Sequence, residues 1–404
     1  MIFYNGKIVT PSSVLEGHAL RVDGSVITTI APLGDRASWS HEEEVDLGGC
    51  YLVPGFIDLH VHGGDGADFM DATPTAWRTV RQAHLRHGTT SLTPTSTVAN
   101  HDQMLQFLER GSSAKYDDQP GSKVLGTHFY GPYFAPLARG CHPKNGLTMP
   151  LESDYGPYLE WSNSICSATI APELPGAEPF TRACRSRNIR CNIGHSHATF
   201  AQVEDAIAWG VQHVDHLFCA MSDRAFLRRL QTFPMRGGVM EATLFFDSLT
   251  TEVIADGKHL SPELLRLAFK IKGPGQLALV TDSSRALDQP DGTYIFGPEE
   301  GGEKILKKDG VGLTEDGLAL ASSVLGMDDM LKTMINAIPE ATIPEIVRMA
   351  TLTPARILGV DHIIGSIQTG KCADMVMLDQ NWNVIKVFQS GKQVASAARK
   401  CAGS

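Results

Sequence analysis

The sequence predicts an α/β protein made of a (β/α)8 barrel and a small β-sheet domain that is built from both ends of the chain. The middle, residues 54–360, alternates short apolar, β-branched runs with segments of helical length. This alternation is typical of parallel strands that helices connect and cover. Residues 1–53 and 361–404 instead contain short strand-like runs that Gly, Asp or Pro interrupt, which indicates a separate small sheet domain.

The predicted elements follow in order along the chain. Strand-like composition at the two ends covers residues 1–10, 18–32, 43–55 and 365–394. Eight apolar runs between them are candidate barrel strands: 55–63, 89–97, 124–132, 167–173, 189–197, 212–218, 251–259 and 276–283. Segments of helical length separate these runs, such as 74–88, 200–210 and 261–273. In a barrel of eight strands the chemistry takes place at the carboxyl ends of the strands.

The composition restricts the partners of the protein. The 404 residues carry 35 basic and 45 acidic side chains, a net charge of −10, so we expect no nucleic-acid partner, because such a partner needs a basic face. Since neither a signal peptide nor the apolar run of about 20 residues that a membrane span needs is found, we expect a cytoplasmic protein without a membrane partner. The eight cysteines are scattered without a CxxC pair and are expected to be reduced thiols.

Histidine and aspartate residues stand at the predicted carboxyl ends of several barrel strands. His60 and His62 flank one residue on the first strand, and alternate residues of a strand point to the same side, so both imidazoles can bind one ion. His195, His216 and Asp282 stand at later strand ends. Four imidazoles and a carboxylate around one cavity suit a divalent transition metal. The sequence therefore predicts a metal site.

Hydrolysis is the chemistry that such a site predicts. A metal ion in an open site lowers the pKa of bound water to about 7 and polarises a carbonyl group. Asp282 is placed to take the proton of that water and pass it to the leaving group. His142, on a loop after the third strand, and His259, at the end of the seventh, are candidates for orienting the substrate. A helix cap for Asp282 and surface positions for the two histidines are the structural alternatives.

Nine segments carry a family resemblance. They are PGFIDLHVHGGDGADFMD (54–71), THFYGPYFAPLARGCHP (127–143), APE (171–173), GHSHA (194–198), DHLFCAM (215–221), EVIADGKH (252–259), LVTDSS (279–284), RMATLTPARILGV (348–360) and GSIQTGKCADMVMLD (365–379). Together they resemble the N-acetylglucosamine-6-phosphate deacetylase family of the amidohydrolase superfamily over nearly the whole chain. The resemblance implies a urease-type β-sandwich beside a (β/α)8 barrel, a homodimer, and removal of acetate from the N-acetyl group of an amino sugar.

The resemblance also implies roles for single residues at the metal site. His60 and His62 match the first-strand metal pair of the family, and His195 and His216 match its ligands from the fifth and sixth strands. Asp282 matches the catalytic aspartate.

The residues expected to bind substrate follow from the same resemblance. His142 matches a residue that contacts the acetamido group, and His259 matches one that contacts the sugar or its phosphate. Where the family reads FNAM this chain reads FCAM, so Cys219 and Ala220 are expected near the phosphate without the Asn of the family. The phosphate-binding arginine is expected at Arg236 or at another arginine of the longer 224–236 loop, because a guanidinium binds two phosphate oxygens at once.

One departure from the family concerns the metal. Where the family reads HLEGP this chain reads HFYGP, so Tyr130 replaces a metal-binding Glu, and a phenol with a pKa of about 10 is a poor ligand. We therefore expect one divalent ion per subunit, held by the first-strand pair and either His195 or Asp282, with His216 as a further ligand or a polariser of substrate. Zinc is the first expectation, with iron, cobalt, nickel or manganese as alternatives. A two-metal site with phenolate ligation is the competing hypothesis.

Three functions stay open on the sequence alone. The leading one is metal-dependent hydrolysis of N-acetylglucosamine 6-phosphate to glucosamine 6-phosphate and acetate. The second is deacetylation of unphosphorylated N-acetylglucosamine or of another N-acyl sugar. The third is a catalytically silent protein that binds sugar or metal, which the replacement at Tyr130 suggests. Against the third, a chain without catalysis has no physical reason to keep a costly cluster of polar groups at a barrel mouth.

Overall fold

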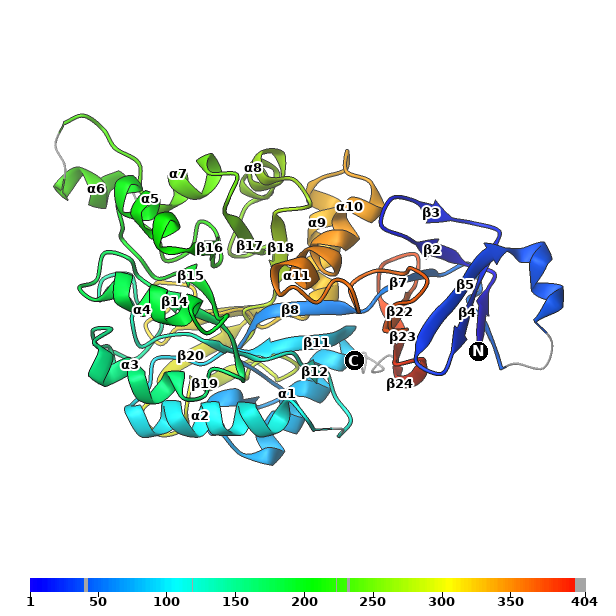
Figure 1. The fold of residues 1–404 in the computed structure, drawn as a ribbon, viewed down its shortest axis with the longest axis horizontal. Coiled ribbons are helices and arrows are strands. Elements are labelled where there is room, and N and C mark those ends of the chain that lie inside the picture. The colour runs from blue at the N-terminus through cyan, green and yellow to red at the C-terminus, as the bar shows by residue number, and fades with distance from the viewer. Residues whose placement is uncertain (40–42, 118, 223, 231–232, 397–404) are drawn as a thin grey trace.

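The computed structural model describes residues 1–39, 43–117, 119–222, 224–230 and 233–396. A barrel of strands and helices forms one part, and a β-sheet domain that contains the N-terminus forms the other (Figure 1). This arrangement confirms the predicted fold class. No helix within the described ranges is long and apolar enough to cross a membrane.

Parallel strands form the barrel. They are β8 (Phe56–Val61), β11 (Thr89–Pro94), β12 (Lys123–Val124), β13 (Thr127–Phe129), β14 (Ile165–Ile170), β15 (Arg190–Ile193), β16 (Val211–Val214), β17 (Thr250–Ile254) and β18 (Leu277–Val280). The sheet closes where the Asp282 amide donates to the His60 carbonyl at 2.8 Å. On its other side, Thr95 and His128 form a parallel bridge between the ends of β11 and β13. The first closure places two predicted site residues side by side.

Helices alternate with these strands. They are α1 (Pro74–Arg86), α2 (His101–Ala114), α3 (Glu152–Leu159), α4 (Ala177–Arg185), α5 (Phe200–Trp209), α6 (Arg224–Leu230), α7 (Val239–Phe245), α8 (Pro262–Lys272), α9 (Met327–Ala337), α10 (Ile343–Met349) and α11 (Leu352–Ile357). Local sequence sets where they begin: Thr73 caps α1 with its side chain and Pro74 occupies the first turn. The helices bury their apolar faces against the strands.

The two ends of the chain meet in the β-sheet domain. Its six-stranded sheet has the order β24-β23-β22-β7-β2-β3 and its four-stranded sheet the order β5-β4-β1-β6. The strands are β1 (Ile2–Tyr4), β2 (Lys7–Val9), β3 (Val14–Leu15), β4 (His18–Asp23), β5 (Val26–Pro32), β6 (Glu44–Asp46), β7 (Tyr51–Pro54), β22 (Met375–Leu378), β23 (Val384–Gln389) and β24 (Lys392–Ser396). Because β7 pairs directly with β22, segments more than 300 residues apart share one sheet.

Several strands are shorter than the sequence predicts. The run 124–132 divides into β12 and β13 around Gly126, whose φ is 148°. A Cβ atom at this position would lie 2.8 Å from Cβ of Cys166, so only glycine fits here. The strand ends at Phe129, so Tyr130 stands at its carboxyl end. In the run 251–259 the strand likewise ends at Ile254, and a bend follows it.

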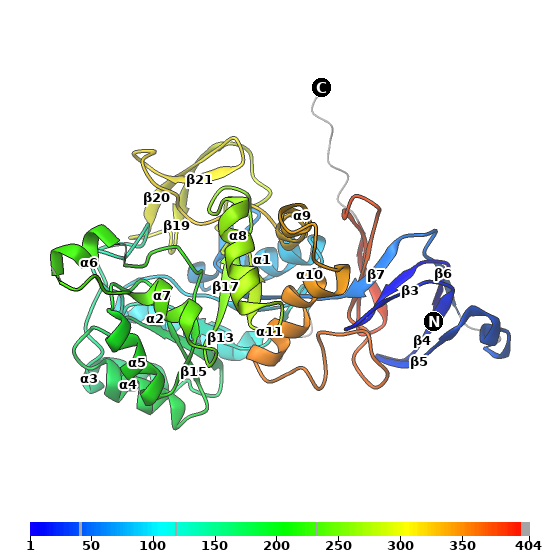
Figure 2. The same cartoon turned by 90° about the horizontal axis from the view of Figure 1, so that it is seen from above.

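A second sheet beside the barrel was not predicted. Strands β19 (Gly292–Phe296), β20 (Glu303–Lys308) and β21 (Val311–Thr314) form an antiparallel sheet between β18 and α9. Figure 2 shows this sheet on the side of the barrel opposite α3, α4 and α5. Its residues follow neither the apolar runs of barrel strands nor the spacing of helices, so the alternation along the chain gave no signal for it. A short hairpin, β9 (Gly63–Gly64) with β10 (Ala67–Asp68), follows β8.

Candidate active site

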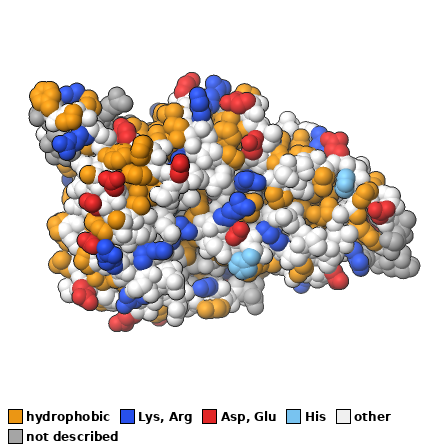
Figure 3. Space-filling model, turned by 45° about the horizontal axis from the view of Figure 1, so that its top comes forward, with side chains coloured by type: hydrophobic (Ala, Val, Ile, Leu, Met, Phe, Trp, Pro, Cys, Tyr) orange, Lys and Arg blue, Asp and Glu red, His pale blue; other side chains and the backbone are white. Residues whose placement is uncertain are grey.

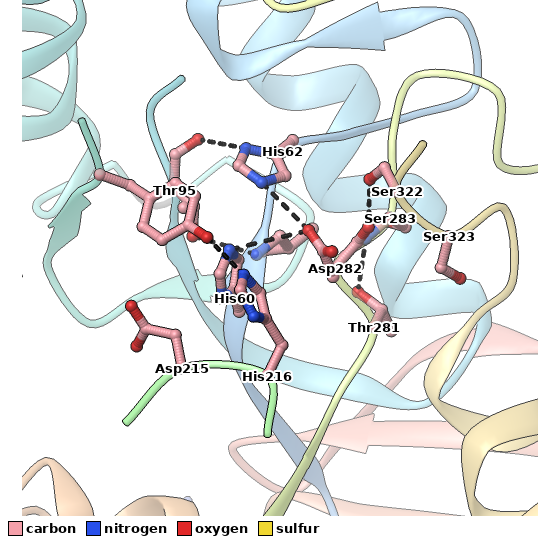
Figure 4. A network of polar contacts seen from close by, with 12 residues as sticks. His60, His62, Thr95, Asp215, His216, Thr281, Asp282, Ser283, Ser322 and Ser323 are labelled. Atoms are coloured by element: carbon pink, nitrogen blue, oxygen red, sulfur yellow. Dashed lines mark hydrogen bonds and ion pairs between the residues drawn. The ribbon is translucent and has the colours of Figure 1, made fainter. Parts of the chain in front are cut away.

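Five predicted site residues come together at the carboxyl ends of four barrel strands. His60 and His62 lie at the end of β8, His195 follows β15, His216 follows β16 and Asp282 follows β18. All five are buried. Figure 4 shows His60, His62, His216 and Asp282 pointing toward one another. Strand ends of a closed barrel converge in this way, which is why residues so distant in sequence meet.

Hydrogen bonds fix the orientation of three of the imidazoles. Nδ1 of His60 donates to Glu252 Oε1 at 2.7 Å, Nδ1 of His62 donates to the Thr95 carbonyl at 3.2 Å, and Nδ1 of His195 donates to the Ala138 carbonyl at 2.7 Å. Since a carbonyl or carboxylate oxygen can only accept, each Nδ1 carries the proton. Each Nε2 therefore presents a lone pair, as a metal ligand does.

The Asp282 carboxylate lies between two of these lone pairs. Its Oδ1 is 3.1 Å from His62 Nε2 and 3.7 Å from His60 Nε2. Within the described part of the chain, His60 Nε2 is buried without a hydrogen-bond partner. Lone pairs at these distances repel one another unless a cation lies among them. Two imidazoles and a carboxylate are also the donor set of a divalent transition metal, so these residues fit the expected ion.

The charges around His60 also favour a bound cation. Burial lowers the pKa of this imidazole, but the carboxylates of Glu252 and Asp282 raise it to about 9. For Asp282, burial favours a higher pKa, yet His60 and His62 hold it below its usual range. A site that draws a proton onto a buried imidazole also attracts a cation. The ligand atoms of His60, His62 and Asp282 all lie within 4.8 Å of one another, and His195 and His216 are not part of that group.

Tyr130 contacts the fourth imidazole. Its hydroxyl lies 2.5 Å from Nε2 of His216, and both side chains are buried. Burial raises the pKa of Tyr130 well above its usual range, and the charges of Asp215 and Asp282 raise it further, so the group stays a phenol. Nδ1 of His216 has no hydrogen-bond partner among the described residues. His216 thus differs from the other three imidazoles.

A cavity of about 310 Å³ opens over this cluster. Four residues expected to bind substrate line it: His142, Cys219, Ala220 and His259. The other lining residues are Tyr130, Gly140, Cys141, His195, His216, Phe218, Ile254, Asp282, Phe296, Leu320 and Ser322. The size fits a small molecule of the sugar class.

Two of the predicted substrate contacts are held firmly. His142 accepts a hydrogen bond from the Val98 amide at its Nδ1. His259 Nδ1 donates to Asp256 Oδ2 at 2.7 Å, and the pKa of His259 is raised by Asp256 although burial opposes it. His259 therefore stands at the wall of the cavity beside a carboxylate that favours its protonated form.

The predicted arginine is not brought to the cavity. Arg236 is exposed and does not line it, and Arg228 and Arg229 are exposed on α6. The side chain of Arg224 lies outside the described residues. Among the residues that the structure describes, no lysine or arginine lines the cavity.

Strained backbone surrounds the site. His195, His216, Phe218, Ala220 and Asp282 all have positive φ, between 24° and 79°. Residues other than glycine seldom adopt this conformation, which costs about 1–3 kcal/mol each and concentrates at functional sites. The turns aim the strand-end side chains into the cavity.

Glu252 is the main residue of the site that the strand-end pattern of histidines and aspartates does not indicate. It is buried in β17 and accepts hydrogen bonds from the rings of His60 and His213 and from the backbone amide of His216. A carboxylate inside a strand that is predicted to be buried in the barrel is a signal that could have identified it. Phe296, from the unpredicted sheet, also lies over the site, with its ring 5.0 Å from that of His62.

The comparisons with known proteins agree with the geometry. The model of the Amidohydrolase family matches residues 51–394. The chain is 31% identical to N-acetylglucosamine-6-phosphate deacetylase of Vibrio furnissii, over 95% of this chain and 94% of that protein. It is 32% identical to N-acetylgalactosamine-6-phosphate deacetylase of Escherichia coli O157:H7, over 96% of this chain and 98% of that protein.

A solved structure extends the likeness to three dimensions. A mutant N-acetyl-D-glucosamine-6-phosphate deacetylase from Mycobacterium smegmatis, in complex with N-acetyl-D-glucosamine-6-phosphate, superposes with a TM-score of 0.85 at 26% identity. The match covers 98% of this chain and 99% of that one. The chain belongs to the N-acetylglucosamine-6-phosphate deacetylases of the amidohydrolase family.

Proposed function

We propose that this protein hydrolyses the amide of an N-acetylated amino sugar 6-phosphate, with N-acetylglucosamine 6-phosphate as the first substrate, and releases acetate and the free amine. The observation that carries the proposal is the group of His60, His62 and Asp282 at the edge of a sugar-sized cavity. The names of the relatives indicate the substrate.

We propose His60 Nε2, His62 Nε2 and Asp282 Oδ1 as the protein ligands of one divalent ion per subunit, zinc first. Three protein ligands and an open position are usual for a catalytic zinc site. The bound ion would lower the pKa of water and polarise the amide carbonyl. His195 lines the same cavity and its Nδ1 is engaged by the Ala138 carbonyl, so its Nε2 is the candidate for a fourth ligand. His216, by contrast, already shares its Nε2 with Tyr130.

Asp282 is proposed to move the proton. Its Oδ1 faces the two imidazoles, which leaves Oδ2 to accept a proton from the attacking water. As water adds to the carbonyl carbon, Asp282 takes this proton and then delivers it to the amine nitrogen, so that the C–N bond breaks and acetate forms. The cavity wall that Asp282 shares with His142 is where the acetamido group would lie.

The sugar and its phosphate would occupy the rest of the cavity. His142 is proposed to contact the acetamido group, and His259, held by Asp256, to contact the sugar or its phosphate. Cys219 and Ala220 form the wall beside His259, and the strained turn at Ala220 presents backbone groups there. Arg236, exposed outside the cavity, would reach the phosphate only after a loop movement or from another subunit.

We propose that the protein acts as a homodimer in the cytoplasm. Phe233, Met235 and Phe245 are large apolar side chains with exposed fractions of 84%, 50% and 69%. Figure 3 shows apolar side chains on the projecting corner of the molecule near α6. A second subunit would cover such a surface. The seven cysteines within the described residues are free thiols, as is usual in a reducing compartment.

One observation favours a second substrate. Because no lysine or arginine among the described residues lines the cavity, an unphosphorylated N-acyl sugar is the competing candidate. Acetate release by the ion-loaded protein should be measured for N-acetylglucosamine and for its 6-phosphate. A higher kcat/KM for the phosphate ester supports the proposal, and an equal or lower value favours the free sugar. No release from either sugar would leave a silent binding protein.

A further inference from the structure

We propose that the hydroxyl group of Tyr130 donates a hydrogen bond to the carbonyl oxygen of the amide substrate, and that His216 holds this hydroxyl in position. The inference deepens the proposed deacetylation and rests on it. His216 differs from the three other imidazoles of the site.

His216 lacks the contact that marks a metal ligand. A histidine that binds a metal almost always donates its second ring N–H to an acceptor. His60, His62 and His195 do so through Nδ1, whereas Nδ1 of His216 meets no acceptor within the described structure. Its Nε2 is already engaged by Tyr130. His216 is thus arranged as the partner of a phenol rather than as a ligand.

No hydrogen bond among the described residues fixes the tautomer of His216. Because none of them forms a hydrogen bond with Nδ1, the ring proton is not tied to that nitrogen and can stand on Nε2 instead. With the proton on Nδ1, Nε2 accepts the Tyr130 hydroxyl. With the proton on Nε2, the ring donates to the phenol oxygen, and the Tyr130 O–H turns toward another acceptor. The Tyr130 hydroxyl can therefore donate to a substrate while the hydrogen bond between Tyr130 and His216 is kept.

Tyr130 is held where an amide carbonyl would lie. It lines the same cavity as Asp282, and its ring centroid is 4.5 Å from that of His60 and 5.3 Å from that of His195. Ser96 fixes the backbone of Tyr130, since its Oγ accepts from the Tyr130 amide at 2.8 Å and donates to the Tyr130 carbonyl at 3.1 Å. The phenol is thus oriented before any substrate arrives.

The chemistry needs such a donor. As water adds to the carbonyl carbon, negative charge develops on the carbonyl oxygen, and a donor already in place stabilises that charge. The phenol keeps its proton throughout, and the proton of the water still passes through Asp282. Loss of one donor of this kind lowers kcat about 100- to 1,000-fold.

Tyr130→Phe tests the assignment, and Tyr133→Phe is the matched control. Tyr133 is equally buried, but its hydroxyl donates to Asp154 Oδ1 and does not reach the cavity. Tyr130→Phe should lower kcat about 100-fold or more, with KM within about threefold and with an unchanged ion content per chain. Tyr133→Phe should keep kcat within about threefold of wild type. A Tyr130→Phe protein with wild-type kcat, or one that loses or gains an ion, contradicts the assignment.

The positioning role of His216 requires a separate readout. If His216 acts through Tyr130, the double variant Tyr130→Phe/His216→Gln should have the same kcat as Tyr130→Phe alone. Independent losses that multiply would refute that role.

Acetate binding separates this inference from the proposed function. The product acetate carries the oxygen that the Tyr130 hydroxyl would contact. Calorimetry on the ion-loaded protein should therefore give a Kd for acetate about tenfold higher for Tyr130→Phe than for wild type. This expectation does not depend on which sugar is the substrate. Equal Kd values, or no acetate binding by wild type, would overturn the role of Tyr130. If acetate binds as expected but no N-acetyl sugar phosphate is hydrolysed, only the proposed function fails.

Discussion

Glu252 Oε1 accepts a hydrogen bond from His60 Nδ1 at 2.7 Å, across 192 residues of sequence. The same carboxylate accepts from His213 Nε2 at 3.2 Å. Burial favours a higher pKa for Glu252, but His60 and His213 hold the pKa well below its usual range, so the group is ionised. An ionised partner fixes the ring of His60 and makes its Nε2 a stronger ligand.

Removing the charge of Glu252 should weaken the ion site. Glu252→Gln keeps the shape of the side chain but loses the negative charge that faces His60. Loss of such a partner typically lowers metal affinity about 10- to 100-fold. Competition of the protein with a chromophoric zinc chelator measures this affinity directly.

Asp215→Asn is the matched control for that experiment. Asp215 is also a fully buried carboxylate near the site, but it accepts hydrogen bonds from Thr169 and Asn192 rather than from a proposed ligand. Burial and the charge of Glu252 raise the pKa of Asp215 to about 8, so a neutral amide resembles its state at neutral pH. Zinc affinity should stay within about threefold of wild type. Equal losses in both variants would contradict the specific role of Glu252.

Replacing the proposed proton carrier should stop turnover. Asp282→Asn cannot accept the proton of water, and loss of general acid–base catalysis costs about 100- to 10,000-fold in kcat. Because Asp282 is also a proposed ligand, the ion content must be measured together with acetate release. A protein that retains both its ion and its wild-type kcat would show that another group moves the proton.

His87 should make stability depend on pH in the neutral to alkaline range. Its Nδ1 donates to Asp328 at 2.8 Å and its Nε2 donates to Asp288 at 3.0 Å. Burial opposes the charged ring, but these two carboxylates raise its pKa to about 10, against about 6.5 in the unfolded chain. The stabilisation of the folded protein by the charged His87 ring is therefore complete below about pH 6.5 and is lost as the pH rises toward about 10.

The variant His87→Asn tests that contribution by denaturant unfolding at several pH values. We expect a loss of about 2 kcal/mol in the free energy of unfolding at pH 6, and a smaller loss at pH 9. His362→Asn, at an exposed histidine, should change stability by less than about 0.5 kcal/mol at either pH. A loss for His87→Asn that is independent of pH would contradict the charged state of the ring.

Local patterns predicted the residues at the strand ends. His60, His62, His195, His216 and Asp282 each follow an apolar run, and the geometry of a barrel brings such positions together. The structure places them in one cluster, as that reasoning expects.

Contacts between residues that are far apart in the sequence set the orientation of the site histidines, and the sequence alone does not indicate these contacts. The orientation of His60 depends on Glu252, and that of His216 on Tyr130, which is 86 residues away. No pattern along the chain indicates which ring nitrogen carries a proton. Phe296 reaches the site from the antiparallel sheet of β19, β20 and β21. The strands of this sheet match neither the apolar runs of barrel strands nor the spacing of helices.

Titration of the ion-free protein with zinc, while acetate release from N-acetylglucosamine 6-phosphate is followed, tests the central claim most directly. The account predicts no release without the ion, a rate that rises in proportion to bound zinc, and a plateau at one ion per chain. Full activity without an ion, or a rate that continues to rise to two ions per chain, would contradict a single ion held by His60, His62 and Asp282.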